Sequence, residues 1–204
     1  MPVSVTDLQY VALAVPDLEA EREFFGKQWG LIEVAEEDGR VYFAAAGMPH
    51  PYVLVLREDS ERKTDLVGFS AASKDDVLAI FEQVKSAGAR IISDPAPASG
   101  PAGGFAFRFF DPDGRAMEVI CDTTPREFRQ LDHGEAIPIG ISHVVLHSPQ
   151  HKELVEWFQE ALGFRLSDWI GDFMGFLRCN SAHHRIAFLR RFKAHHRLNT
   201  FWGF

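Results

Sequence analysis

The chain has 204 residues, of which 46% are hydrophobic and 25% are charged, and its formal net charge is −8. This composition is typical of an ordinary globular protein and argues against disorder and low-complexity repeats, while the acidic balance argues against nucleic-acid binding, which needs clustered Lys and Arg. No apolar run reaches the ~20 residues of a membrane span, and the first residues lack a signal-peptide pattern, so we expect a cytoplasmic protein that does not bind membranes.

A β-rich run over 8–15 opens the first of three similar units. It turns at Pro16-Asp17, with Asp17 as an expected N-cap, and continues as an amphipathic helix. Short strands are then predicted over 31–34, 41–45 and 52–56, with Asp38-Gly39 as the turn between the first two. The pattern predicts one βαβββ unit.

The same order recurs in the second unit. A strand over 66–71 precedes Ser73 as N-cap, and a helix is predicted over 74–87, ending at Gly88. Further strands are expected over 90–92, 105–110 and 117–121. Because one unit alone leaves an apolar face and open strand edges, the two units are expected to pair into a complete domain over 1–123, with one curved mixed sheet and both helices on its outer face.

A polar, proline-bearing stretch over 124–140 is the expected interdomain linker. The third unit follows over 141–204. Its first strand is predicted to end at Ser148, which caps a helix that begins at Pro149 and closes at Gly163, and three strands follow. The predicted fold class is therefore α+β, with paired βαβββ modules and a third, unpaired βαβββ module. Because that module is unpaired, we expect a homo-oligomer formed through it.

Two segments resemble a known family. FAFRFFDPDGRAMEVICD resembles the strand-turn-strand signature that ends a domain in the vicinal oxygen chelate superfamily, which includes glyoxalase I, bleomycin-resistance proteins and type I extradiol ring-cleavage dioxygenases. The stretch that begins ISHVVLHSPQHKELVEWF and ends CNSAHHRIAFL resembles the start of the catalytic domain of a two-domain extradiol dioxygenase. The resemblance implies ring cleavage of a catechol-type aromatic, with Fe(II), or less often Mn(II), held by two histidines and one glutamate.

The resemblance also implies roles for single residues. It places the first metal ligand at His143 and an acid/base histidine at His184, a role that suits a group titrating near neutral pH. Four phenylalanines are candidates for a surface on which a small aromatic substrate stacks, while core packing is the favoured interpretation: Phe107, Phe109, Phe173 and Phe176. Of these, Phe173 and Phe176 are the predicted substrate-binding residues.

The sequence departs from the family pattern at the other ligands. Thr200 stands where the second histidine is expected, and the strand that carries the glutamate is absent from the sequence. A truncated reading frame would explain this loss, while His195 and His196, or a second chain, are alternative ligand sources. In the N-terminal domain the equivalent positions are Tyr10, about Leu66, and Glu118, and a lone carboxylate does not predict a metal there.

Two functions therefore stay open. The first is an extradiol dioxygenase whose metal site lacks two of its three expected ligands in this sequence. The second is a non-catalytic protein of the same fold that binds or sequesters a small aromatic molecule in the concave face of its sheet, without a cofactor.

Overall fold

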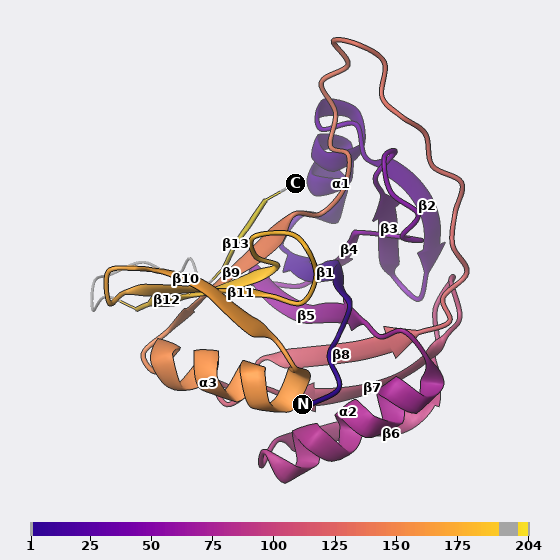
Figure 1. Cartoon of the computed structure of the whole chain (residues 1–204). Helices are drawn as coiled ribbons and strands as arrows, with labels where there is room; N and C mark the ends of the chain where they lie inside the picture. The colour runs from indigo at the N-terminus through magenta and orange to yellow at the C-terminus, as the bar shows by residue number, and fades with distance from the viewer. Residues whose placement is uncertain (1, 192–199, 204) are drawn as a thin grey trace.

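The structure is a computed structural model, and it describes residues 2–191 and the backbone of residues 200–203 (Figure 1). The first unit consists of β1 (Asp7–Val15), α1 (Leu18–Glu23), the π-helical turn η1 (Phe24–Gln28), β2 (Ile32–Glu37), β3 (Arg40–Ala44) and β4 (Leu54–Glu58). The Asp17 carboxylate caps α1 by accepting from Ala20 N at 2.9 Å, as expected. The wider turn of η1 ends the regular helix early and brings the rings of Phe24, Phe25 and Trp29 into mutual contact.

The second unit consists of β5 (Lys63–Ser70), α2 (Lys74–Ser86), β6 (Arg90–Pro97), β7 (Phe105–Phe110) and β8 (Ala116–Cys121). The Ser73 hydroxyl caps α2 by accepting from Asp76 N at 3.1 Å. Helix α2 packs on β6, β7 and β8 through Val77, Ile80 and Val84, which are fully buried. The alternating apolar residues of the strands therefore meet the apolar face of this helix, as the sequence predicts.

The first two units share one eight-stranded mixed sheet with the order β2-β3-β4-β1-β5-β8-β7-β6. At its centre β1 runs antiparallel to β5, with Val11 opposite Val67. Within each unit the first and last strands are parallel neighbours, β1 with β4 and β5 with β8. This topology confirms the predicted pairing of two βαβββ modules in a mixed sheet.

The third unit forms a second sheet. It consists of β9 (His143–Ser148), α3 (His151–Leu162), β10 (Arg165–Ile170), β11 (Met174–Arg178) and β12 (Ile186–Arg190). The sheet order is β10-β11-β12-β9-β13, where β13 (Thr200–Gly203) lies antiparallel to β9. The α+β fold class with a third βαβββ unit is thus confirmed, while the domain boundaries at 123 and 140 stay a prediction.

The start of α3 differs from the expectation. Its N-cap is Gln150 and the helix begins at His151, two residues after the predicted start at Pro149. The Ser148 hydroxyl accepts from Gln150 N at 2.9 Å and closes a turn before the helix instead of capping it. Gly163 ends the helix with φ of +69°, as predicted. Among the described residues, none of the helices is both long and apolar enough to cross a membrane.

The two sheets share one core. Figure 1 shows α2 and α3 side by side on the same side of the molecule, and the two helices are in contact. The Trp157 indole donates to Ala87 O at 2.9 Å, and the Phe158 ring lies 6.5 Å from Phe69 and 4.7 Å from Phe188. The helical side of the third module is therefore covered within the chain, and the opposite face of its sheet carries the candidate site.

The segment over 124–140 has neither helix nor strand, and Figure 1 shows it passing around the end of the molecule that holds α1. It is held by backbone contacts, because Arg126 N donates to Pro49 O at 3.1 Å and Arg129 N donates to Ala46 O at 3.0 Å. These two hydrogen bonds hold the segment against the first module.

Candidate active site in the third module

Parallel pairing of β9 with β12 brings His143 and His184 together. Val144 lies opposite Ile186 across the two strands, and Val144 N donates to Arg185 O at 3.1 Å. His143 begins β9 and His184 lies just before β12, so their rings meet at the same end of the strand pair. The ring centroids are 4.5 Å apart, with 52° between the ring planes.

Neighbouring side chains orient both imidazoles. The Ser142 hydroxyl lies 3.0 Å from His143 Nδ1, which leaves Nε2 of His143 for other partners. His183 Nδ1 lies 3.0 Å from His184 Nδ1. In that contact one nitrogen must donate and the other accept, so it is lost when both rings are protonated. The Phe176 ring packs edge-on against His184 at 4.8 Å.

Both imidazoles favour their neutral form. Burial is the main cause that lowers the pKa of His184 to about 4, and repulsion from positive charge on His143, His183 and Arg185 contributes to the same shift. Burial also lowers the pKa of His143, again with a contribution from Arg185. At neutral pH each ring therefore keeps a lone pair, which is the form that accepts a proton or binds a metal.

The four candidate phenylalanines fall in different places. Phe176 packs beside the histidines, whereas Phe173 is half-buried at the turn between β10 and β11, where its carbonyl accepts from Arg190 N at 2.7 Å. Phe107 and Phe109 follow the core-packing interpretation that the sequence favours. Both are fully buried, and the Phe107 ring contacts Phe81 of α2, so these side chains are core and face the helices.

The described residues do not complete a three-ligand iron site. Within the ranges 2–191 and 200–203, no group of three His, Cys, Asp or Glu side chains is placed to hold a metal ion. The backbone of β13 places Thr200 opposite Leu146 on β9. The alternative ligands His195 and His196 lie outside the described residues. Of the expected ligand set, the described side chains supply His143 alone.

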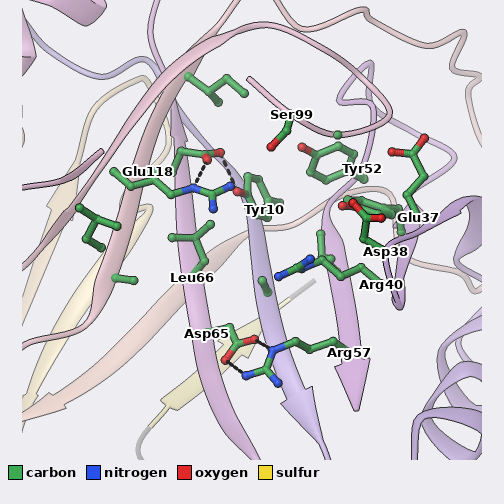
Figure 2. Close-up of a pocket in the computed structure, with 18 residues that line it drawn as sticks. Tyr10, Glu37, Asp38, Arg40, Tyr52, Arg57, Asp65, Leu66, Ser99 and Glu118 are labelled. Atoms are coloured by element: carbon green, nitrogen blue, oxygen red, sulfur yellow. Dashed lines mark hydrogen bonds and ion pairs between the residues drawn. The ribbon is translucent and has the colours of Figure 1, made fainter. Parts of the chain in front are cut away.

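The equivalent positions in the N-terminal domain form a different environment. Tyr10, Leu66 and Glu118 line one cavity on the concave face of the first sheet (Figure 2). Glu118 is 3% exposed, and its carboxylate accepts from the Tyr10 hydroxyl and from Arg108 Nε, both at 2.6 Å. Because both carboxylate oxygens accept hydrogen bonds from the protein, Glu118 is not available as a metal ligand. The sequence analysis did not identify Arg108, which the register between β7 and β8 places opposite Glu118.

Comparison with known proteins identifies the family. Residues 7–119 match the sequence model of the Glyoxalase/Bleomycin resistance protein/Dioxygenase superfamily. The chain belongs to this superfamily. The match covers the two paired modules, and the third module repeats the same order of elements.

Members of the superfamily with known names or structures are similar to most of this chain. The metapyrocatechase of Pseudomonas sp. (strain CF600) is 27% identical over 170 residues, which are 78% of this chain and 55% of that protein. The chain spans about half the length of the curated relatives it matches.

Two solved structures are similar to most of this chain. The Mn(II)-bound glyoxalase from Novosphingobium aromaticivorans is 45% identical, has a TM-score of 0.90, and the match covers 92% of this chain and 62% of that one. The 2,3-dioxygenase LapB from Pseudomonas sp. KL28 is 26% identical with a TM-score of 0.78, over 94% of this chain and 72% of that one.

Proposed function

We propose that the protein is an extradiol ring-cleavage dioxygenase that acts on a catechol-type aromatic and uses Fe(II), with Mn(II) as the second option. The observation that carries the proposal is the pair of neutral imidazoles, His143 and His184, beside Phe176 on the exposed side of the third module. The names of the relatives, a metapyrocatechase and a 2,3-dioxygenase among them, support it.

The described side chains suggest a division of roles. His184, neutral at pH 7, would accept the proton of a substrate hydroxyl, and its contact with His183 would hold the ring in place. Its pKa of about 4 differs from the near-neutral titration expected from the sequence and makes the free ring a weaker base. Phe176 would flank the aromatic ring of the substrate. A substrate-binding role for Phe173 stays a prediction. Phe173 lies at the turn between β10 and β11, and none of the contacts described above joins it to His143 or His184.

His143 would supply one metal ligand through Nε2, because Ser142 occupies the other ring nitrogen. A facial triad needs two more ligands, for which the proposal depends on His195 and His196 or on a second copy of the chain. Association of two copies through the third module and a cytoplasmic location remain parts of this proposal.

The count of ligands also favours a second candidate. With His143 as the single expected ligand among the described residues, the third module would serve instead as a binding surface for an aromatic molecule, without turnover. Metal binding separates the two candidates, because the second does not need it.

The test is anaerobic purification with Fe(II), followed by metal analysis of the wild type and of two variants. The enzymatic proposal predicts stoichiometric iron in the wild type, loss of iron in His143→Ala, and retention of iron in His184→Ala. Wild-type protein without iron, or iron content that does not depend on His143, would overturn the proposal and favour the binding protein.

A further inference from the structure

The cavity in the N-terminal domain is separate from the histidine cluster and has a volume of about 580 Å³. This volume falls within the ~300–1,000 Å³ that ligand sites typically have. The concave face of the first sheet forms its floor, the β2–β3 turn with Asp38 forms one side, and the loop that carries Ser99 and Gly100 forms another (Figure 2). The domain therefore contains a partly open cavity of ligand size.

Two phenol groups in this cavity have unused hydrogen-bonding capacity. The rings of Tyr42 and Tyr52 meet edge to face with centroids 5.0 Å apart, and Tyr52 meets Tyr10 at the same distance. Tyr10 donates to Glu118, whereas the hydroxyls of Tyr42 and Tyr52 have no hydrogen-bond partner in the part of the chain that the structure describes. Burial raises the pKa of both phenols, so they remain donors at neutral pH.

Arg108 adds a cation to the same wall. Its Nε donates to Glu118, while its two terminal nitrogens have no protein hydrogen-bond partner among the described residues. Because Glu118 already accepts from two donors, the inner wall has more donors than acceptors. A ligand that matches it must bring acceptors, and an anionic group gains most from the guanidinium.

The floor of the cavity is apolar. Ala12, Val55, Leu66 and Ile120 project from neighbouring strands of the sheet toward the space between the tyrosines and Arg108. Such a surface suits the faces of a planar hydrocarbon ring, and the tyrosines offer edge-to-face contacts to it. The acidic side chains at the mouth, Glu37 and Asp38, are exposed, so solvent screens their charges.

We propose that this cavity binds a monocyclic aromatic carboxylate, with the carboxylate on Arg108 and the hydroxyls of Tyr42 and Tyr52 and the ring over the apolar floor. A cationic aromatic is disfavoured because its charge would face the guanidinium of Arg108. The site requires neither a metal nor the histidine cluster, so it stands or falls independently of ring cleavage.

Calorimetric titration in EDTA tests this proposal with 4-hydroxybenzoate as the probe and p-cresol and 4-hydroxybenzylamine as neutral and cationic comparators. The wild type should bind 4-hydroxybenzoate at least ~10-fold more tightly than p-cresol, as a charge-assisted hydrogen bond allows. Tyr52→Phe keeps the ring and removes the hydroxyl, and it should weaken 4-hydroxybenzoate binding by ~3- to 10-fold.

A double variant tests the role of the cation without leaving a buried carboxylate unpaired. Arg108→Met combined with Glu118→Gln removes both charges and keeps an amide oxygen for the Tyr10 hydroxyl, so the domain should fold. This variant should lose the preference for the acid over p-cresol. Arg62→Gln serves as the control, since Arg62 pairs with Glu21 outside the cavity, and it should bind as the wild type does.

Three results would overturn the assignment. These are absence of 4-hydroxybenzoate binding to the wild type, equal affinity for the acid and p-cresol, and loss of binding in His143→Ala. The last result would show that the acid binds at His143 and His184 and not in the cavity. Retained binding in His143→Ala together with weakened binding in Tyr52→Phe would support the cavity.

Discussion

The rings of His143 and His184 lie 4.5 Å apart, centroid to centroid, at neighbouring ends of two parallel strands. At this distance a proton on one ring disfavours a proton on the other, and partial burial disfavours both charged forms. The hydrogen bond between His183 and His184 adds to the effect, because it cannot persist when both rings are protonated. His143 and His184 therefore favour their neutral forms at physiological pH.

A pH-dependent stability follows from the lowered pKa of His184. The folded protein has a pKa of about 4 at this ring against 6.5 for an unperturbed histidine, so the unfolded chain takes up the proton first as the pH falls. Stability from this group is complete above pH 6.5, is lost as the pH falls toward 4, and changes no further below 4. The loss should be about 1 kcal/mol, because the ring is partly solvated.

Urea unfolding of the wild type and of His184→Gln across this pH range measures that loss. As the pH falls from 6.5 to 4, the free energy of unfolding of the wild type should fall by about 1 kcal/mol relative to that of His184→Gln. Parallel pH profiles would show that His184 does not have a lowered pKa in the folded state.

Turnover should depend on His184 far more than on its neighbour His183. In a protein with ring-cleavage activity, His184→Ala should lower the rate by about 10²- to 10⁴-fold, since it removes the proton acceptor. His183→Ala is the matched control, because His183 is exposed and contacts His184 without being assigned a role in proton transfer. Steady-state rates with catechol measure both variants, and equal losses would contradict the assignment.

The core that joins the two sheets should respond strongly to loss of Phe158. Its side chain is fully buried and contacts Phe69 of the first sheet and Phe188 of the second. Phe158→Ala should lower the free energy of unfolding by about 3–5 kcal/mol. Phe128→Ala is the control, since Phe128 is 59% exposed, and it should change stability by less than ~0.5 kcal/mol in the same denaturation experiment.

Two glycines near helix ends separate backbone strain from a steric clash. Gly88 has φ of +80° and nothing within 4 Å of an added Cβ, whereas Gly163 has φ of +69° and an added Cβ would lie 2.7 Å from Val3 O. Gly88→Ala should cost about 1–2 kcal/mol from the left-handed backbone alone. Gly163→Ala should cost more, because the N-terminal segment must also move. Equal losses in thermal unfolding would show that the close approach is unimportant.

Periodicity and turn residues predict most of the fold. Asp17, Ser73 and Gly163 each mark a helix end that the structure confirms, because capping depends on local hydrogen bonds that a short sequence contains. Ser148 shows the limit of this method. The same hydroxyl chemistry closes a turn as readily as it caps a helix, and the structure selects the turn.

The candidate site was predictable in part. Resemblance to a family placed His143 and His184 near one another, which periodicity alone does not do. The structure confirms the favoured core-packing interpretation of Phe107 and Phe109, which lie on the face of β7 opposite Arg108 and point toward the helices. The ion pair of Arg108 with Glu118 depends on the register between β7 and β8, which the sequence pattern does not specify.

Ring cleavage itself is the most direct measurement of the proposed function. Wild-type protein supplied with Fe(II) and incubated with catechol under air should form the yellow ring-fission product, and His143→Ala treated in the same way should not. Absence of product from wild-type protein, or equal product from His143→Ala, would contradict the assignment of this chain as an extradiol dioxygenase with His143 as a metal ligand.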